Sequence, residues 1–481
     1  MKVWIDKAAE ETPNNDFEDA IRFDMLDEGP KSNLKVNFEE IWRRFNRDNL
    51  ENIYEDLITV AASVYAADKR VPRVGVWAGE VEDNWTREIH ISIPVLELKK
   101  WSEVKTKLED ILNFLSGDIW TVNFRKTNLK FRNYVTKKKY DIIAGEFDAV
   151  SLFSGGLDSY SGAINLLRNE KNICFVGCRE YNALGKRISE LYRILKENYI
   201  GCNVDIVLFN TDPRIPYNID EDLKTKYIEN TSRSRSFLFL SVALAVASQI
   251  GGKVPVYIPE NGFIGLNLPL TPSRRGSCST RTTHVYFINE LNNLLQMLQI
   301  SHRVENFFAY KTKGEIVQSV KMTKAFKLGA GKTISCSHPM RADKGIKGRP
   351  RNCGYCYPCL IRRASLNGID ISEEYLEDFK EDYKIGMTFV RNEKFSNPDT
   401  GKTTDLKAVL LAVHNYLKHG SKDYYTEKLI LLGGGGMDMQ EIEKFVDVYM
   451  KSMGELYNFI KEQARFNGNE LLQFIEEGID E

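Results

Sequence analysis

The sequence predicts an α/β fold: a doubly wound parallel sheet, with an N-terminal α+β domain before it and a C-terminal helical region after it. The first observation is that helix-like segments separate four short apolar runs in the middle of the chain, an alternation typical of βαβ units. The second is that a polar loop follows each run, and ligands bind at the carboxyl ends of parallel strands. The runs FDAVSLF, NICFVGC, VDIVLFN and VPVYIPE start at Phe147, Asn172, Val204 and Val254.

Residues 1–145 are predicted to form the α+β domain. The segment NIYEDLITVAASVYAADKR has apolar residues at helical spacing, and RVGVWAG and REIHISIPV alternate as strands do. A second helix, WSEVKTKLEDILNFL, and a strand, DIWTVNFRK, follow them. This part of the sequence contains no catalytic constellation, so we expect an accessory role.

The middle domain is predicted to span residues 146–370, and the C-terminal helical domain residues 371–481. The latter contains two long segments with helical spacing, TDLKAVLLAVHNYLKHG and MQEIEKFVDVYMKSMGELYNFIKEQARFNG. Gly433–Gly436 lies between them. This four-glycine run lacks a following hydroxyl and lysine pair, so a linker or helix cap is favoured over a phosphate loop.

The composition narrows the class of function. A net charge of −1 over 481 residues excludes a generally basic nucleic-acid binder, although nucleic acid at a local patch stays open. The run RKTNLKFRNYVTKKKY is such a patch, but a lysine-blunted sheet edge explains it better. The longest apolar stretch, Phe237–Ile250, is too short to span a bilayer, and no apolar signal region begins the sequence. We expect a cytoplasmic protein, and the use of eight cysteines agrees with a reducing compartment.

The first polar loop has a composition suited to phosphate. Adjacent glycines let the backbone approach a ligand closely, and the N–H groups of the helix start bind anions. An aspartate in the loop can hold Mg²⁺ beside the phosphates. An ordinary strand-to-helix turn is the alternative, which the flanking serines disfavour. The cofactor-binding candidates are Ser154, Gly155, Gly156, Leu157, Asp158 and Ser159.

Four downstream cysteines have the spacing of a metal site. A C-x2-C-x2-C knuckle is joined to one upstream cysteine, and the set is Cys336, Cys353, Cys356 and Cys359. Four thiolates suit a closed tetrahedral zinc site, whose role is structural because no position is left for water. Scattered free thiols are the alternative, which this spacing disfavours.

The SGGLDS loop resembles the PP-loop of ATP pyrophosphatases, enzymes that split ATP between its α- and β-phosphates and leave AMP on a substrate oxygen. The resemblance implies an adenine nucleotide alpha hydrolase-like fold that uses ATP and Mg²⁺. Taken with the cysteines, residues 147–370 are similar to the 7-cyano-7-deazaguanine synthase (QueC-like) family. The segments RSFLFLSVALAVASQIGG, YIPENG, TKGEIV and CLIRR match family segments in the same order.

The chain departs from that family mainly on the substrate side. Ile264 stands nearest to a family aspartate, Arg235-Ser236 replaces an Arg-Asn pair, and SRRGSCSTRTTHVYF replaces a Tyr-Pro-Asp-Cys-Arg segment. Adenylation is therefore better supported than the identity of the acceptor.

The resemblance also implies roles for individual residues. The loop would hold the ATP phosphates with Asp158 assisting Mg²⁺, and Lys313 and Arg235 would neutralise the departing pyrophosphate. His284 lies in the segment that departs from the family, and its chemistry alone makes it a candidate to remove a proton as the amine attacks. A lone histidine is more often structural. The catalytic candidates are thus Asp158, Ser159, Lys313, Arg235 and His284.

Two groups of residues are candidates for binding 7-carboxy-7-deazaguanine, the substrate that the resemblance implies. Glu260, Asn261 and Phe263 would contact its guanine-like face, although a polar loop end explains them too. Residues in the segment that departs from the family would bind the carboxylate or the amine. These are Arg281, Thr282 and Thr283.

The length of the chain helps to indicate which amine is the acceptor. With two added domains, it is most similar to the long relatives in bacterial antiphage defence operons, of the Qat and CBASS types. That resemblance implies an AMP-forming ligase that couples the deazaguanine through an amide to the N-terminus of a partner protein from the same operon. The added domains would dock the partner, or else form a homo-oligomer.

Three other functions stay open from the sequence. Ammonia as the acceptor would give a nitrile for queuosine-type biosynthesis. A non-catalytic nucleotide-binding scaffold is the second alternative, which the intact loop disfavours. The third is a sulfur-inserting enzyme acting on transfer RNA, for which Cys278 is the only free cysteine near these motifs.

Overall fold

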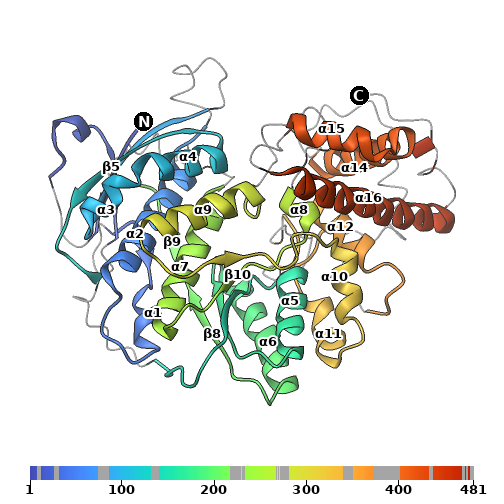
Figure 1. The fold of residues 1–481 in the computed structure, drawn as a ribbon, viewed down its shortest axis with the longest axis horizontal. Coiled ribbons are helices and arrows are strands. Elements are labelled where there is room, and N and C mark those ends of the chain that lie inside the picture. The colour runs from blue at the N-terminus through green and yellow to red at the C-terminus, as the bar shows by residue number, and fades with distance from the viewer. Residues whose placement is uncertain are drawn as a thin grey trace.

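The computed structural model comprises two sheets of parallel strands with their helices, followed by a group of helices at the C-terminal end (Figure 1). Residues 74–79, the four-glycine run and Cys278 lie outside the described residues. The structure describes residues 1–7, 12–25, 32–73, 86–131, 140–216, 229, 233–266, 268, 270, 281–337, 339, 350–371, 401–432, 437–467, 472 and 475–476.

The central sheet has the strand order β11-β10-β6-β7-β8, and every pairing in it is parallel. The chain runs outward from β6 through β7 to β8, and then returns to place β10 on the other side of β6. This is a doubly wound topology with its switch point between β6 and β10. The α/β class and the parallel sheet are thereby confirmed. The strands are β6 (Ala149–Leu152), β7 (Ile173–Cys178), β8 (Val204–Phe209), β10 (Val256–Tyr257) and β11 (Val304–Glu305).

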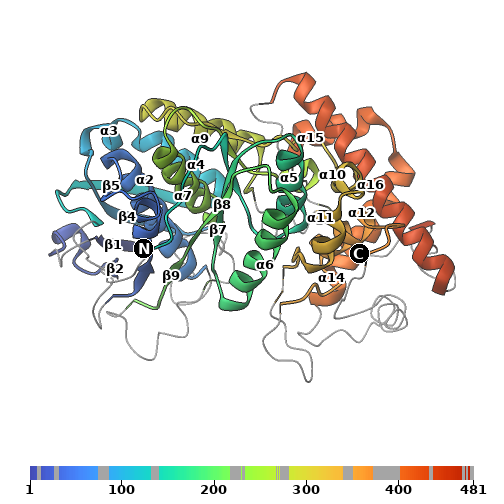
Figure 2. The same ribbon diagram turned by 90° about the horizontal axis from the view of Figure 1, so that it is seen from below.

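Two helical layers cover this sheet. Phe175 of β7 packs in one core with α5 (Leu157–Arg168) and α6 (Asn182–Asn198), whereas its neighbour Val176 packs in another with α7 (Arg235–Ile250). Successive side chains of a strand point to opposite faces, so a strand covered on both sides is apolar throughout. Figure 2 shows α7 and α6 on opposite sides of β7 and β8.

The N-terminal segment forms a second parallel sheet in the order β2-β1-β4-β5. All of its pairings are parallel, which corrects the expected α+β class to α/β. The physical reason is the crossover through α3 (Leu98–Glu103) and α4 (Lys105–Ser116), which returns β5 beside β4 in the same direction. The strands are β1 (Lys2–Asp6), β2 (Ile21–Asp24), β4 (Glu88–Val95) and β5 (Ile119–Lys126).

The two sheets share one apolar core. Helix α2 (Asn52–Arg70) is buried on all sides from Ile53 to Asp68, because it packs against both β4 and α7. In addition, β3 (Leu34–Val36) pairs antiparallel with β9 (Thr211–Pro213). The first 145 residues are therefore joined to the central sheet by packing and by backbone hydrogen bonds.

The C-terminal helices pack on the central unit around a separate apolar core (Figure 1). That core includes residues of α8 and α12, which flank the loops at the end of the central sheet. The helices are α8 (Gly262–Leu266), α12 (Tyr357–Ser365), α14 (Gly401–His419), α15 (Lys422–Leu432) and α16 (Met439–Asn467).

The remaining helices connect these parts. Within the described ranges, no helix combines the length and apolar character needed to cross a bilayer. These connecting helices are α1 (Glu39–Arg43), α9 (Val285–Met297), α10 (Lys313–Val320), α11 (Lys324–Gly329) and the short 3-10 helices η1 (Asn15–Phe17) and η5 (Ala330–Lys332).

Candidate functional site

The loops after β6 and β10 meet at the switch point of the central sheet. The chain leaves the two adjacent strands toward opposite faces of the sheet, and ligands of such sheets bind at this point, outside the carboxyl ends of the strands. The SGGLDS loop, residues 154–159, follows β6, and Glu260 and Asn261 follow β10. The Nδ2 of Asn261 donates to the Oδ2 of Asp158 at 2.7 Å, so the structure brings these candidates into contact.

The SGGLDS loop turns sharply into the start of a helix. Gly155 has a φ of +77°, in the left-handed region that favours glycine, and a Cβ there would lie 3.1 Å from Cγ1 of Ile188. Gly156 is the N-cap of α5, so the last three residues of the loop form the first turn of that helix. The N–H of Gly156 donates to the Oγ of Ser154 at 3.3 Å, and the hydroxyl of Ser159 donates to the carbonyl of Gly156 at 3.1 Å. The loop therefore gathers hydroxyl and N–H groups at a helix N-terminus, and phosphate binding there stays a prediction.

The carboxylate of Asp158 is the centre of a buried polar cluster. Its Oδ2 accepts from the Nζ of Lys313 at 2.8 Å as well as from Asn261, and the Asp158 residue is 5% exposed. Burial alone would raise the pKa of Asp158, but the charge of Lys313 and the hydrogen bonds from neighbouring side chains outweigh it and lower the pKa. Asp158 is therefore ionised at neutral pH.

Glu260 lies beside Asp158 as a second carboxyl. Burial, the negative charge of Asp158 and a hydrogen bond between the two carboxyls raise the pKa of Glu260 well above its usual value. The raised pKa favours the neutral form of Glu260 beside the charged Asp158. Asn261 is fully buried, and its Oδ1 accepts from the N–H of Ile264 at 3.0 Å. Its polar groups orient Asp158 and α8 instead of being exposed to a substrate.

One oxygen of Asp158 fits a magnesium ion. The Oδ1 atom is buried and accepts no hydrogen bond from any N–H or hydroxyl group in the described part of the chain. Carboxylate oxygens are the protein ligands that Mg²⁺ prefers, and Mg²⁺ in nucleotide sites is bound by one or two carboxylates plus phosphate oxygens. The residues present therefore suit the cation that accompanies ATP.

A segment ahead of the first cluster cysteine supports the SGGLDS loop from outside. The N–H of Ile334 donates to the carbonyl of Gly155 at 2.9 Å. The N–H of Leu157 donates to the Oγ of Ser335 at 3.2 Å, which satisfies one N–H group of the first turn of α5. Sequence reasoning missed Ser335, and its only signal is the position directly before Cys336.

Arg362 holds this supporting segment in place. It is fully buried, and its guanidinium donates to the Oγ1 of Thr333 at 2.6 Å and to the carbonyl of Ala330 at 2.8 Å. The match of CLIRR to the family segment singles out Arg362 but gives it no role. The structure places it two contacts away from the loop, where it acts by positioning the segment that contains Ser335.

Lys313 is the first residue of α10, and a helix of the C-terminal region contacts the same turn. Thr312 and Glu315 form a capping box, with hydrogen bonds of 3.0 and 2.9 Å. Glu455 of α16 accepts from the hydroxyl of Thr312 and, at 3.2 Å, from the N–H of Gly314. The position of Lys313 therefore depends in part on α16.

Arg235 lies at the end of β7 and not against the SGGLDS loop. Its Nε pairs with Oε1 of Glu180 at 3.1 Å, and its guanidinium lies 4.9 Å from the ring centroid of Phe239. Arg235 thus belongs to the same edge of the sheet as the loop, but its charge is already paired. The geometry gives no support to its predicted role in neutralising pyrophosphate.

His284 and Arg281 pack against α4, away from the SGGLDS loop. Arg281 donates to the carbonyl of Phe114 at 2.7 Å. The Nδ1 of His284 accepts from the N–H of Tyr286 at 3.2 Å and caps α9, and its ring lies 5.2 Å from that of Phe114. Burial and the charge of Arg281 lower the pKa of His284 to about 4. The structure therefore gives His284 a role as the N-cap of α9. Its contacts give no support to the predicted proton transfer.

Two further substrate candidates, Phe263 and Thr283, are buried in the fold. Phe263 is 2% exposed and packs between Tyr357 and Tyr449, at centroid distances of 6.0 and 5.6 Å, so neither face of its ring is open for stacking. Thr283 is buried, and its Oγ1 has no hydrogen-bond partner among the described groups. Thr282 is half-buried in the turn between Arg281 and Thr283.

The four cysteines lie together, as their spacing predicts. Their sulfur atoms all lie within 4.8 Å of one another, and the pairs Cys336–Cys356 and Cys353–Cys359 are 3.9 Å apart. A tetrahedral zinc ion with Zn–S bonds of about 2.3 Å requires sulfur atoms about 3.8 Å apart. The cluster can therefore hold a metal such as zinc, in a closed site that leaves no coordination position for a reactant.

Comparison of the chain with protein families and with curated proteins gives no match. No family model matches the chain. The curated proteins likewise contain no significant match. The residues at the switch point and the cysteine cluster are therefore the basis for assigning a function.

Proposed function

We propose that the protein uses ATP to adenylate the carboxylate of 7-carboxy-7-deazaguanine, or of a close analogue, and that the N-terminal amine of a partner protein then displaces AMP to form an amide. The observation that carries this proposal is the contact of Asp158 with Lys313 and Asn261 at the switch point, directly after an anion-binding glycine loop. The likeness of SGGLDS and the cysteine spacing to the QueC-like PP-loop enzymes supplies the substrate class.

The proposed reaction has two steps. A carboxylate oxygen of the substrate attacks the α-phosphorus of ATP, and the bond to pyrophosphate breaks. The amine then attacks the activated carbonyl carbon, the C–N bond forms, AMP leaves, and the amine loses one proton. No covalent bond to the enzyme is required, because alignment of the reactants supplies much of the rate acceleration.

The residues of the SGGLDS loop would bind and orient the phosphates. Backbone N–H groups and the hydroxyls of Ser154 and Ser159 donate to phosphate oxygens, and Lys313 lies where negative charge builds up on pyrophosphate. Magnesium, when bound at Asp158, would neutralise phosphate charge. His284 has no part in this scheme, so the proton passes to another group or to water.

The test is the release of AMP from ATP, Mg²⁺ and 7-carboxy-7-deazaguanine by the full chain, with mass spectrometry of proteins encoded by neighbouring genes. The wild type should release AMP and add the deazaguanine acyl mass to the N-terminus of one such protein. Replacement Asp158→Asn should lower the rate about 100-fold or more, because it removes a charge that the transition state requires. The matched control is Asp148→Asn, an exposed aspartate just before the amino end of the same strand, which should keep the wild-type rate.

Other outcomes separate the alternatives. The nitrile formed from ammonium, with no modified protein, would identify a biosynthetic synthase. Nucleotide binding without AMP release, unchanged in Asp158→Asn, would identify a scaffold. An absence of AMP with every acceptor would refute the substrate assignment.

A further inference from the structure

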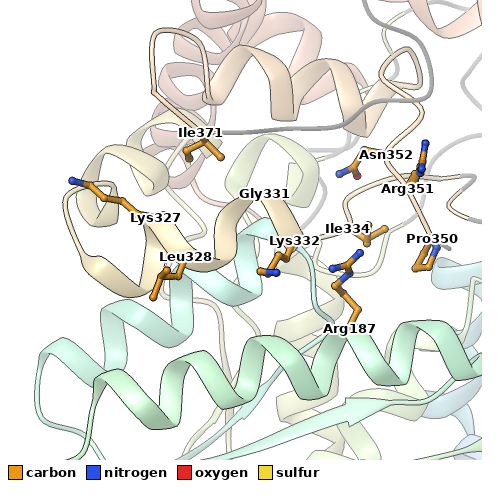
Figure 3. A pocket seen from close by; sticks show the side chains of 10 residues that line it. All are labelled: Arg187, Lys327, Leu328, Gly331, Lys332, Ile334, Pro350, Arg351, Asn352 and Ile371. Atoms are coloured by element: carbon orange, nitrogen blue, oxygen red, sulfur yellow. The ribbon is translucent and has the colours of Figure 1, made fainter.

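A basic cavity lies outside the segment that supports the SGGLDS loop. Its volume is about 360 Å³, within the range of small-molecule sites. Arg187 of α6, Lys332 of η5 and Arg351 line it, together with Lys327 of α11 (Figure 3). Ile334 also lines the cavity, while its N–H bonds to Gly155, so the cavity and the loop lie on either side of one short segment.

The cavity has an excess of positive charge. Glu190 pairs with Arg187 at 3.0 Å and with Lys332 at 2.6 Å. In the part of the chain that the structure describes, no carboxylate pairs with Lys327 or Arg351. Four cations and one flanking carboxylate leave three positive charges in excess, and such a cavity attracts anions.

The rest of the lining is apolar or already hydrogen-bonded. The apolar side chains of the lining are Leu328 and Ile371 on one side, and Ile334 and Pro350 on the other (Figure 3). The amide of Asn352 is occupied, because its Oδ1 accepts from the N–H of Ser335 at 2.9 Å and its Nδ2 donates to the carbonyl of Thr333 at 3.1 Å. The cavity therefore offers cations for an anionic group and apolar surface for a flat body.

We propose that this cavity is a second site that binds a nucleoside phosphate, separate from the ATP loop. Phosphate oxygens would contact Arg187, Lys332 and Arg351, and the base would lie against the apolar walls. A cavity of this size favours a small molecule over a nucleic-acid strand, which requires an extended groove. Because Ile334 contacts both sites, a bound nucleotide can change the conformation of the SGGLDS loop. This proposal does not depend on the adenylation chemistry.

The test is equilibrium dialysis of radiolabelled AMP against the full chain in the presence of Mg²⁺, with variants of the cavity compared with the wild type. We expect at least one AMP per chain. The double variant R187Q/R351Q should bind AMP about tenfold more weakly, because two charged hydrogen-bond donors are lost. The control R193Q/K324Q removes one exposed cation from each of α6 and α11 outside the cavity, and should bind AMP as the wild type does.

Two further measurements separate folding and ligand class. R187K/R351K keeps both charges and should retain most of the affinity, which would show that charge and not misfolding weakens R187Q/R351Q. Labelled pyrophosphate should bind more weakly than AMP because it has no base for the apolar walls.

Several results would overturn the proposal. They are no AMP bound at millimolar concentration, equal affinity in R187Q/R351Q and R193Q/K324Q, pyrophosphate binding as tight as that of AMP, or binding of single-stranded oligonucleotides but not of AMP. The dialysis involves no turnover, so a failure of adenylation would leave its result unchanged.

Discussion

The imidazole of His284 makes stability depend on pH. Burial and the charge of Arg281 lower its pKa from 6.5 to about 4 in the folded chain. Between these values the unfolded chain binds a proton that the folded chain does not. The stabilisation due to the neutral ring is therefore complete above pH 6.5 and is lost as the pH falls toward 4. The aromatic ring that faces it, Phe114, carries no compensating charge.

Replacement His284→Asn should remove this dependence while keeping a side chain that can cap α9. From pH 7.5 to pH 5, the wild type should lose about 2 kcal/mol of unfolding free energy that the variant does not lose. Urea denaturation of both proteins at the two pH values measures the difference. Equal losses in the two proteins would contradict the buried neutral state of His284.

Single residues also show how far the sequence could be interpreted. The grouping of the four cysteines could be predicted because the role of thiolates depends on local spacing, whereas phosphate binding by SGGLDS stays a prediction. The roles of Asn261 and Phe263 depend on what surrounds them in three dimensions. Asn261 is buried against Asp158, and Phe263 lies between rings of α12 and α16. No pattern within YIPENGF reveals that these side chains are already occupied.

Helix α10 connects the candidate site to the C-terminal region. Its first turn bears Lys313, and Glu455 of α16 accepts hydrogen bonds from Thr312 and Gly314 in that turn. Glu455 is therefore a positioning residue, since it touches the turn and not Asp158. A single carboxylate that accepts two donors cannot be replaced fully by an amide, which offers one acceptor oxygen.

Replacement Glu455→Gln should lower the unfolding free energy by about 1 kcal/mol, because one hydrogen bond is lost. It should also raise the KM for ATP in the AMP-release assay more than it lowers kcat, since Lys313 loses its fixed position but keeps its charge. Steady-state kinetics and urea denaturation measure both effects. Glu441 lies on the same helix and accepts a hydrogen bond from the hydroxyl of Tyr310 at 3.3 Å. The control replacement Glu441→Gln should alter neither the kinetic constants nor the unfolding free energy by much. Equal kinetic effects of the two variants would exclude the positioning role.

At the scale of elements, length decided what the sequence could predict. Strands β6, β7 and β8 and helices α2, α14 and α16 have apolar patterns long enough to recognise. Strand β10 was also predicted, within VPVYIPE, although it has only two residues. Strand β11, which likewise has two, was not predicted, and the β3–β9 pair joins segments far apart in the chain. Pairing direction is also absent from a local pattern, which is why the parallel N-terminal sheet was predicted as α+β.

The cysteine cluster links metal binding to the whole fold of the site. Cys336 follows Ser335, and Cys353 follows Asn352, whose amide bonds to both ends of the Thr333–Ser335 segment. A metal bound by these thiolates therefore fixes the segment that supports the SGGLDS loop. Binding free energy of a structural metal contributes directly to folding.

Elemental analysis should find about one zinc per chain. Replacement Cys356→Ser or prolonged chelation should remove it, lower the melting temperature and weaken ATP binding, as calorimetry and titration would measure. Cys202→Ser, a half-exposed cysteine outside the cluster, should retain the metal. Full zinc content in Cys356→Ser would refute the four-cysteine site.

The burial of α2 against α7 has a consequence for synthesis on the ribosome. Helix α7 ends at Ile250, whereas α2 ends at Arg70, about 180 residues earlier. At about 5–20 residues per second, α2 waits roughly 9–36 s before the helix that covers it is made. During that interval the nascent chain exposes the apolar face that α7 later covers, so translation speed through residues 146–250 and the supply of chaperones should govern the yield of native protein.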